Sequence, residues 1–143
     1  MKKLPYVALS ATFFDDPDID AAGPMPTLLY LQMACRVRQL RSDGFIHEVH
    51  VKRLGFPKWQ THIRTLVSVG LVTEHTDANG SPAWYLPAYL KWNPPEESYL
   101  RKSHEGTLWA CKGRHGGEPP CDRDKCQEAA AWLSTHPTPA PTP

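Results

Sequence analysis

The order of local patterns between residues 26 and 92 constrains the fold of this chain more than any other feature. Apolar residues spaced three and four apart predict an amphipathic helix over residues 26–41. Glycine and proline then interrupt the helical pattern, so we expect short elements rather than one long helix. The patterns that follow are a turn at 42–46, a short helical segment at 48–54, a break at 55–57 and a second helix at 58–69.

A hairpin is predicted directly after the second helix. Residues 71–76 and 83–86 have the composition of strands, and they flank Asp77-Ala78-Asn79-Gly80-Ser81, which is typical of a tight turn. Helix, short strand, short helix, helix and two-stranded wing are the ground plan of a winged helix-turn-helix domain, an α+β fold. We therefore expect such a domain over residues 26–92.

The two helices are expected to supply the core of this domain. Cys35 lies inside the first helix with no cysteine or histidine nearby in sequence, so we expect a small core residue rather than a reactive thiol. The second helix separates its faces clearly, with Trp59, Ile63, Leu66 and Val67 on the apolar side. The first helix carries its apolar stripe at Leu28, Leu29, Leu31, Met33, Ala34, Val37 and Leu40.

The other face of the second helix is a set of hydrogen-bonding side chains. In a helix-turn-helix, such a face enters the major groove, where Arg and Gln contact base edges. Lys52 and Arg53 are expected near the DNA backbone, and Asn79 and Gly80 at the tip of the wing are expected to contact sugar-phosphate or the minor groove. The alternative interpretation is an ordinary solvated helix. The predicted contact residues of the helix are Lys58, Gln60, Thr61, Arg64, Thr65 and Ser68.

Charge is distributed unevenly along the chain, although the formal net charge is only +1. Residues 31–70 contain seven lysines and arginines against two acidic residues, Asp43 and Glu48. Residues 1–30 contain four aspartates between Asp15 and Asp20, for which turns and helix ends are a simpler explanation than a calcium loop. The helical part is therefore the basic part, as phosphate binding requires.

The sequence resembles a family of small winged-helix proteins of actinobacterial phages and mobile elements, often described as helix-turn-helix or replication-initiation-like. The resemblance covers roughly residues 4–100 and implies a DNA-binding fold without catalytic residues. Its motifs are Tyr6-Val7-Ala8-Leu9 with Phe13-Phe14, Ser42-Asp43-Gly44-Phe45-Ile46-His47, Leu66-Val67-Ser68-Val69-Gly70-Leu71-Val72 and Tyr89-Leu90-Lys91-Trp92-Asn93-Pro94.

Four further segments flank the predicted domain. Residues 1–25 are expected to form an N-terminal arm that docks as a short strand or extended chain, and residues 93–110 a linker and a helix to about Trp109. That helix could support a homodimer or reach along DNA. Residues 111–133 are expected to form a small Cys/His module that ends in a short helix, and residues 134–143 are expected to form a disordered Pro-rich tail.

The Cys/His module has the spacing C-x3-H-x5-C-x4-C at Cys111, His115, Cys121 and Cys126. Tetrahedral zinc takes four thiolate or imidazole ligands at about 2.0–2.3 Å, and short glycine-rich loops let a chain wrap around it. We expect a structural, zinc-knuckle-like site, with His104 as a competing fourth ligand. Reduced thiols without metal and a disulfide within the cluster remain open. Catalytic zinc is not expected, because capping explains the nearby carboxylates.

The leading hypothesis for function is a sequence-specific protein that binds double-stranded DNA, of phage or mobile-element origin. Transcription control, replication initiation and recombination are all open roles. The alternative is an adaptor that binds a host or phage protein such as a polymerase, nuclease or integrase. An enzyme is not expected, because no phosphate loop or nucleophile motif occurs. With no apolar run long enough for a membrane span, we expect a location in the cytoplasm, the host's if a phage encodes the chain.

Overall fold

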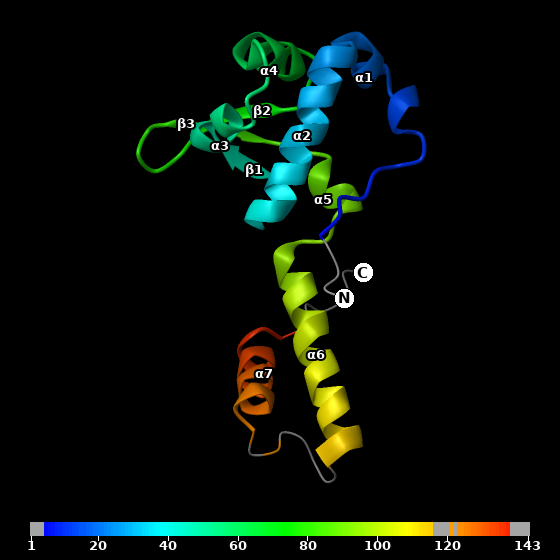
Figure 1. Ribbon diagram of the computed structural model, residues 1–143, viewed down its shortest axis with the longest axis vertical. Helices are drawn as coiled ribbons and strands as arrows, with labels where there is room; N and C mark the ends of the chain where they lie inside the picture. Colours follow the sequence, from blue (N-terminus) through cyan, green and yellow to red (C-terminus); the bar gives the residue numbers. More distant parts are fainter. Residues whose placement is uncertain (1–4, 116–120, 122, 138–143) are drawn as a thin grey trace. The chain divides into compact units, whose positions relative to one another are not determined.

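The chain divides into two compact units at Pro95, in a computed structural model that describes residues 5–115, 121 and 123–137 (Figure 1). The first unit combines helices with a small antiparallel sheet and is an α+β structure. Its elements are the 3-10 helix η1 (Phe13–Asp15), α1 (Pro17–Ala22), α2 (Pro24–Leu40), β1 (Phe45–His47), α3 (Glu48–Arg53), α4 (Trp59–Ser68), β2 (Thr73–Thr76), β3 (Pro82–Tyr85) and α5 (Tyr89–Trp92).

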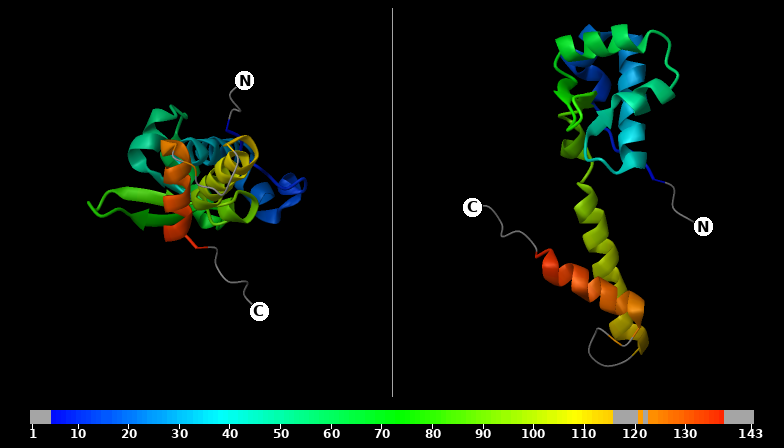
Figure 2. Two further views of the ribbon diagram at one scale, coloured as in Figure 1. Left: turned by 90° about the horizontal axis from the view of Figure 1, so that it is seen from below. Right: turned by 90° about the vertical axis from the view of Figure 1, so that its left-hand side faces the viewer.

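The sheet joins a strand between two helices to the hairpin that follows them. Its strand order is β1-β3-β2, and both neighbouring pairs are antiparallel. Ile46 of β1 and Trp84 of β3 are paired and both are buried. The face of the sheet that carries these two side chains therefore covers the core. The β2–β3 hairpin projects from the rest of the first unit (Figures 1 and 2).

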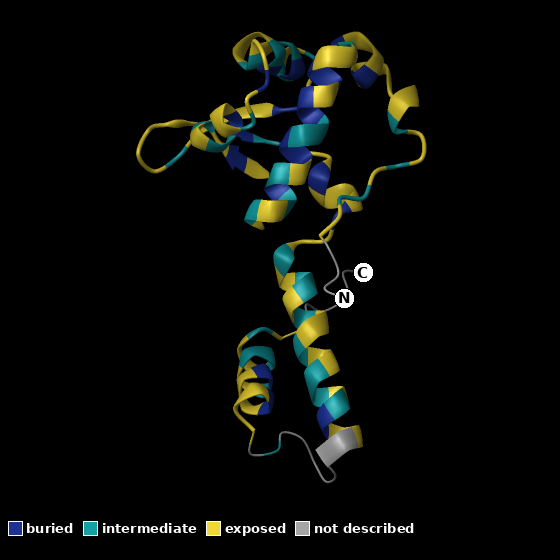
Figure 3. Ribbon diagram, in the orientation of Figure 1, coloured by how far each residue is buried: buried dark blue, intermediate teal, exposed yellow. Residues whose placement is uncertain are grey.

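Helix α2 is buried along one face because its apolar side chains recur each turn. It begins at Pro24, where the missing N–H of proline costs no hydrogen bond, and ends at Leu40, after which the C-cap residue Arg41 takes the left-handed conformation. The N–H of Ser42 donates to the carbonyl oxygen of Val37 at 3.3 Å and closes the last turn. Figure 3 shows the buried and exposed positions alternating along the helix.

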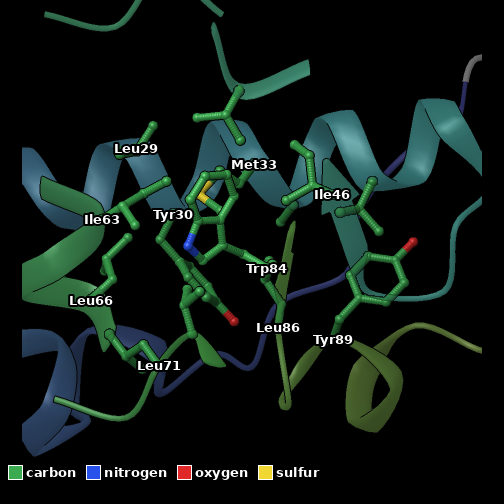
Figure 4. Packing of buried hydrophobic residues seen from close by; sticks show 14 of the residues in the cluster. Leu29, Tyr30, Met33, Ile46, Ile63, Leu66, Leu71, Trp84, Leu86 and Tyr89 are labelled. Atoms are coloured by element: carbon green, nitrogen blue, oxygen red, sulfur yellow. The ribbon is translucent and has the colours of Figure 1, made fainter. Parts of the chain in front are cut away.

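The core of the first unit forms between α2, α4 and the sheet. Leu29 and Met33 of α2 lie against Ile63 of α4 and Trp84 of β3 (Figure 4). The ring of Trp59 contacts Trp84 edge-on at 5.9 Å between centroids, which ties the start of α4 to the sheet. The largest fully buried side chains are Leu29, Met33, Val37, Ile46, Val51, Leu66, Val72 and Leu86.

The N-terminal arm is extended around Ala8 and forms no strand within the described residues. It is held by Asn93, whose side-chain oxygen accepts from the Ala8 N–H at 2.8 Å and whose amide donates to the Ala8 carbonyl at 3.1 Å. Asp16 then caps α1 by accepting from the Asp18 N–H at 2.8 Å. The aspartates of this region therefore act in a helix end, as expected.

Two expectations about the first helix are wrong. Cys35 is exposed rather than buried, and Leu28 is 45% exposed. Ala34 and Val37 lie on the buried face, and each step along a helix rotates by about 100°, which carries Cys35 past the edge of that face. The apolar stripe is narrower than the composition of this helix indicates.

The second unit is a pair of helices, α6 (Glu96–His115) and α7 (Asp124–Thr135), that pack against each other (Figures 1 and 2). The helix expected to end near Trp109 continues to His115, so Cys111 lies within it. Helix α7 extends beyond the short helix expected at 127–133, and it includes the first residues of the predicted tail, of which 138–143 lie outside the described residues. Over the described residues, every helix is too short or too polar to cross a membrane.

Candidate nucleic-acid interface and cysteine centre

Helix α4 presents a polar surface opposite its buried face. Ile63 and Leu66 are 2% and 0% exposed, whereas Gln60, Thr61 and Arg64 are exposed. Trp59 is half-buried against Trp84, so the helix cannot rotate about its axis without breaking this contact. The fold therefore holds one face of α4 toward solvent.

The polar residues of α4 are not equally available to a ligand. The Thr65 hydroxyl donates to the Thr61 carbonyl at 3.3 Å, and the Ser68 hydroxyl donates to the Thr65 carbonyl at 2.7 Å. No hydrogen bond or ion pair joins the guanidinium of Arg64 to another residue in the described ranges. Gln60 and Arg64 are thus the side chains of this face best placed to meet a partner.

Helix α3 adds positive charge beside α2. Arg53 is exposed, while the Lys52 ammonium forms an ion pair with Glu48 at 2.6 Å. Burial lowers the pKa of His50, and the positive charges of Arg53, Arg36 and His47 lower it further. Arg36 and His50 are absent from the contact residues that the sequence predicts. His50 lies three residues before Arg53 on α3, and Arg36 of α2 lies close enough to His50 to lower its pKa. The approach of Arg36 depends on tertiary packing, and no local pattern signals it.

A single carboxylate holds the turn of the β2–β3 hairpin, which is the predicted wing. Asp77 accepts from the backbone N–H groups of Asn79 and Ser81, both at 2.9 Å, and its second oxygen lies 3.4 Å from Nδ1 of His47 on β1. The pKa of Asp77 is lowered mainly because the Ser81 N–H donates to it. Asn79 and Gly80 are exposed at the tip, and Gly80 takes a φ of 78°. A rigid turn therefore presents these two residues to solvent.

Lys58 stands at the entry to α4. It is the N-cap residue, in a left-handed conformation with φ 54°, and its side chain is exposed without capping the helix. Helix α4 thus begins one residue later than expected, at Trp59. Lys58, Gln60 and Arg64 are all exposed and belong to α4 or its N-cap, whereas Arg53 is the last residue of α3.

Three of the four cysteines meet in the second unit. The sulfur atoms of Cys111, Cys121 and Cys126 lie within 4.8 Å of one another. Cys111 lies in α6, Cys121 precedes α7, and Cys126 lies in the first turn of α7. All four cysteines belong to the described residues, and none forms a disulfide. This cluster can hold a metal ion.

A backbone hydrogen bond and burial shift the pKa values of two thiols of the cluster in opposite directions. The pKa of Cys121 is lowered, chiefly because the backbone N–H of Arg123 donates to its sulfur. The pKa of Cys126 is raised to about 11, chiefly by burial and in addition by the neighbouring Cys121 and Cys111. Without a cation, a thiolate is therefore more favourable at Cys121 than at Cys126. A bound cation would favour the thiolate form of each ligand, because metal ligation deprotonates thiols.

The two candidate histidine ligands have different positions. His104 is seven residues before Cys111, about 10.5 Å along a helix, and its ring lies 4.9 Å from the ring of Trp132 rather than in the cysteine cluster. His115 is the last residue of α6, four residues after Cys111, and its side chain lies outside the described part of the chain. Three thiols are thus brought together, and His104 is not among their neighbours.

Two features of the described chain are candidate functional sites: the exposed face of α4 with the basic residues and the β2–β3 hairpin, and the cysteine centre. The resemblance to winged helix-turn-helix proteins of actinobacterial phages stays a prediction. Comparisons of the chain with protein-family models, curated proteins and solved structures find no match.

Proposed function

We propose that this chain binds double-stranded DNA in a sequence-specific manner through a winged helix-turn-helix domain formed by α2 to β3. The observation that carries the proposal is the element order α2-β1-α3-α4-β2-β3, with the hairpin closing a sheet on β1 and the polar face of α4 exposed. In this arrangement α4 is the recognition helix, α3 is the helix before it, and β2–β3 is the wing.

The proposed contacts divide into base readers and phosphate binders. Arg64 and Gln60 would read base edges, because both are exposed and their side chains can form paired hydrogen bonds with guanine and adenine. The cations Arg53, Lys58 and Lys52 would hold phosphates, with Arg36 as an addition from the structure. Asn79 and Gly80 would contact sugar-phosphate. Thr61, Thr65 and Ser68 would add contacts from hydroxyl oxygens that can still accept hydrogen bonds.

The test is a fluorescence titration of the full chain with a duplex from the DNA that flanks its own gene. Measurements at about 50 and 200 mM salt should show binding that weakens with salt, because phosphate contacts release counterions. Arg64→Ala should weaken specific binding by about 1–3 kcal/mol. Lys91→Ala is the matched control, since Lys91 is an exposed cation on α5, at the opposite end of the first unit from α4. Binding that neither salt nor Arg64→Ala changes would contradict the proposal.

We also propose that the ion of the cysteine centre is structural Zn²⁺. Three thiolates from Cys111, Cys121 and Cys126 suit zinc, which prefers sulfur and nitrogen ligands in a tetrahedral arrangement. The fourth ligand would be His115, one turn after Cys111 along α6, or a molecule from solvent. Metal content of protein purified without added zinc tests this. A reduced protein that contains no metal would contradict it.

A second candidate function, binding to another protein, is favoured by the exposed aromatic side chains. Trp109 of α6 is 81% exposed, and Tyr6 and Phe14 are both 69% exposed. Large exposed aromatic residues are more typical of protein interfaces than of free surface. A stoichiometric partner that co-purifies with Arg64→Ala but not with Trp109→Ala would support this function over DNA binding.

A further inference from the structure

The helical hairpin formed by α6 and α7 has almost no apolar core. Among its described residues, only Cys111, Cys126 and Ala129 are buried, at 2%, 4% and 1% exposure. Two of the three are members of the cysteine cluster. A unit of this size cannot bury enough apolar surface to fold by itself and usually requires a metal, a disulfide or a partner.

The packing between the helices is also open near the cluster. A pocket of about 450 Å³ lies beside Cys111 and Cys126. Its remaining lining is small or polar: Ser103, Gly106, Thr107, Ala110, Arg123 and Lys125. No large apolar side chain from α6 meets one from α7 across this pocket. Side-chain packing therefore contributes little at the end of the hairpin where the cysteines meet.

The opposite end of the hairpin is held by polar and aromatic contacts. The ring of His136 stacks on Trp132 at 4.1 Å, and the guanidinium of Arg101 lies 5.6 Å from the Trp132 ring. Arg101 also donates to the carbonyl oxygen of His136 at 2.6 Å. The contacts of Arg101 join the end of α7 to α6 near its start. They leave the cysteine end, about three helical turns away at Cys111, without an equivalent anchor in the described residues.

We infer that the second unit is a metal-stapled hairpin, in which α6 and α7 stay packed only while one thiophilic ion bridges Cys111, Cys121 and Cys126. This inference rests on the zinc proposal and not on DNA binding. The three ligands come from both sides of the hairpin: Cys111 from α6, Cys126 from the first turn of α7, and Cys121 from the chain just before α7. A single ion therefore cross-links the two helices at the end that lacks a core.

The geometry favours a metal over a disulfide as the cross-link. Tetrahedral zinc at about 2.3 Å from sulfur places the sulfur atoms about 3.8 Å apart, close to the present limit of 4.8 Å. A disulfide needs about 2.05 Å, joins only two sulfurs and leaves the third thiol unused. Gln127 of α7 also holds Cys121 in place, because its side-chain amide donates to the Cys121 carbonyl at 2.9 Å. One ion satisfies all three thiols with small movements.

The test is amide hydrogen exchange of the full chain, read peptide by peptide, with zinc bound and after chelation under reducing conditions. We expect one zinc per chain, and after its removal a loss of protection by about tenfold or more in residues 96–137. Residues 5–95 should keep their protection, because their core contains no residue of the second unit. Returning Zn²⁺ alone should restore protection.

Single substitutions at the ligands distinguish loss of the metal cross-link from a general loss of stability. Cys111→Ser, Cys121→Ser and Cys126→Ser should each lose the metal and the protection of residues 96–137. Cys35→Ser is the matched control, since Cys35 is exposed on α2 and should keep both. With Co²⁺ in place of zinc, thiolate-to-metal absorption should appear in the Cys35→Ser protein and weaken in each of the other three.

The outcomes distinguish this inference from the proposals it rests on. Protein without metal would contradict both the zinc proposal and the staple. Metal that binds and leaves without changing protection of residues 96–137 would overturn the staple alone. A mass two hydrogens lower than expected, in protein purified without oxidant, would show a disulfide and would also overturn it. DNA binding, measured on the same samples, decides the function of the first unit separately.

Discussion

Asn93 is the residue that fastens the N-terminal arm to the first unit. It is 3% exposed, and besides its two bonds with Ala8 its amide donates to the Tyr89 carbonyl at 3.2 Å. The side chain thus pairs with the Ala8 backbone as a neighbouring strand would, across 85 positions of sequence. A buried amide used in this way cannot be replaced by a carboxylate, which has no N–H to donate.

Asn93→Asp should destabilise the protein by about 1–3 kcal/mol at pH 7, because the Ala8 carbonyl loses its side-chain donor, the Tyr89 carbonyl keeps only the backbone N–H, and a charge is buried beside them. Urea unfolding followed by tryptophan fluorescence measures this. The same change at Asn79, which is exposed on the wing, should stay within about 0.5 kcal/mol. Equal effects of the two substitutions would show that the amide of Asn93 is not a clamp.

Gly44 is a second residue whose role depends on close contact. Its φ is 105°, and a Cβ there would lie 2.7 Å from Cε2 of Tyr85. The Gly44 carbonyl also accepts from the Leu86 N–H at 2.9 Å, so the backbone cannot easily move away. Gly44 therefore combines a left-handed conformation with a steric limit.

Gly44→Ala should destabilise the first unit by about 2–3 kcal/mol, because backbone strain and a clash with Tyr85 add. Gly80→Ala is the control, since Gly80 has a φ of 78° but no atom within 4 Å of its Cβ position. It should cost only about 1 kcal/mol, for strain alone. Thermal melts of the two variants give the comparison, and a Gly80→Ala effect as large as that of Gly44→Ala would rule out the clash.

At the scale of elements, the β2–β3 hairpin depends on the ionised form of Asp77. The folded protein lowers the pKa of Asp77, so its carboxylate stabilises the hairpin turn at pH values above the ordinary range of an aspartate. That stabilisation is lost as the pH falls through the lowered pKa. The turn should therefore loosen in acid and be unaffected between neutral and mildly acidic pH.

Asp77→Asn should lower the melting temperature at pH 7 and make less difference at an acidic pH below the lowered pKa of Asp77, where the carboxylate of the parent protein is protonated. The comparison is the melting temperature of both proteins at the two pH values. Amide exchange in residues 73–85 locates the change. A difference between the proteins that is the same at both pH values would show that the charge of Asp77 does not stabilise the turn.

Helix α3 carries two neighbouring cations, Lys52 and Arg53, that have different surroundings in the structure. Lys52 is paired with Glu48, whereas Arg53 lies near Arg36 and His50 in a region of positive charge. Arg53→Ala should therefore weaken the proposed DNA binding more than Lys52→Ala. It should also reduce the slope of log affinity against log salt concentration by about one. Titrations at several salt concentrations measure both quantities. A larger effect of Lys52→Ala would contradict this assignment of the phosphate contact.

At the scale of the whole molecule, the chain consists of two units with different sources of stability. The first has a continuous apolar core from Ile19 to Tyr89, and the second has the cysteine cluster and the contacts of Trp132. Chelation of the metal should therefore leave DNA affinity within about twofold while the second unit loses its structure. Titration of the duplex before and after chelation checks this, and a large loss of affinity would show that the second unit contributes to binding.

The sequence by itself determined the local elements and their chemical faces. Apolar spacing located α2 and α4, and the residues from Asp77 to Ser81 located the hairpin turn. These features depend on neighbours within a few positions, so a local pattern is sufficient to predict them. The three cysteines were also identified as a group from their spacing, because they lie on a short segment of chain.

Only the tertiary structure decided which of these residues meet. The pairing of β1 with β3, the clamp between Ala8 and Asn93, and the approach of Arg36 to His50 all join segments far apart in sequence. It also placed Cys35 outside the core and His104 against Trp132 rather than among the cysteines. Each depends on the rotation and register with which whole elements pack, and side-chain periodicity along one element does not contain that information.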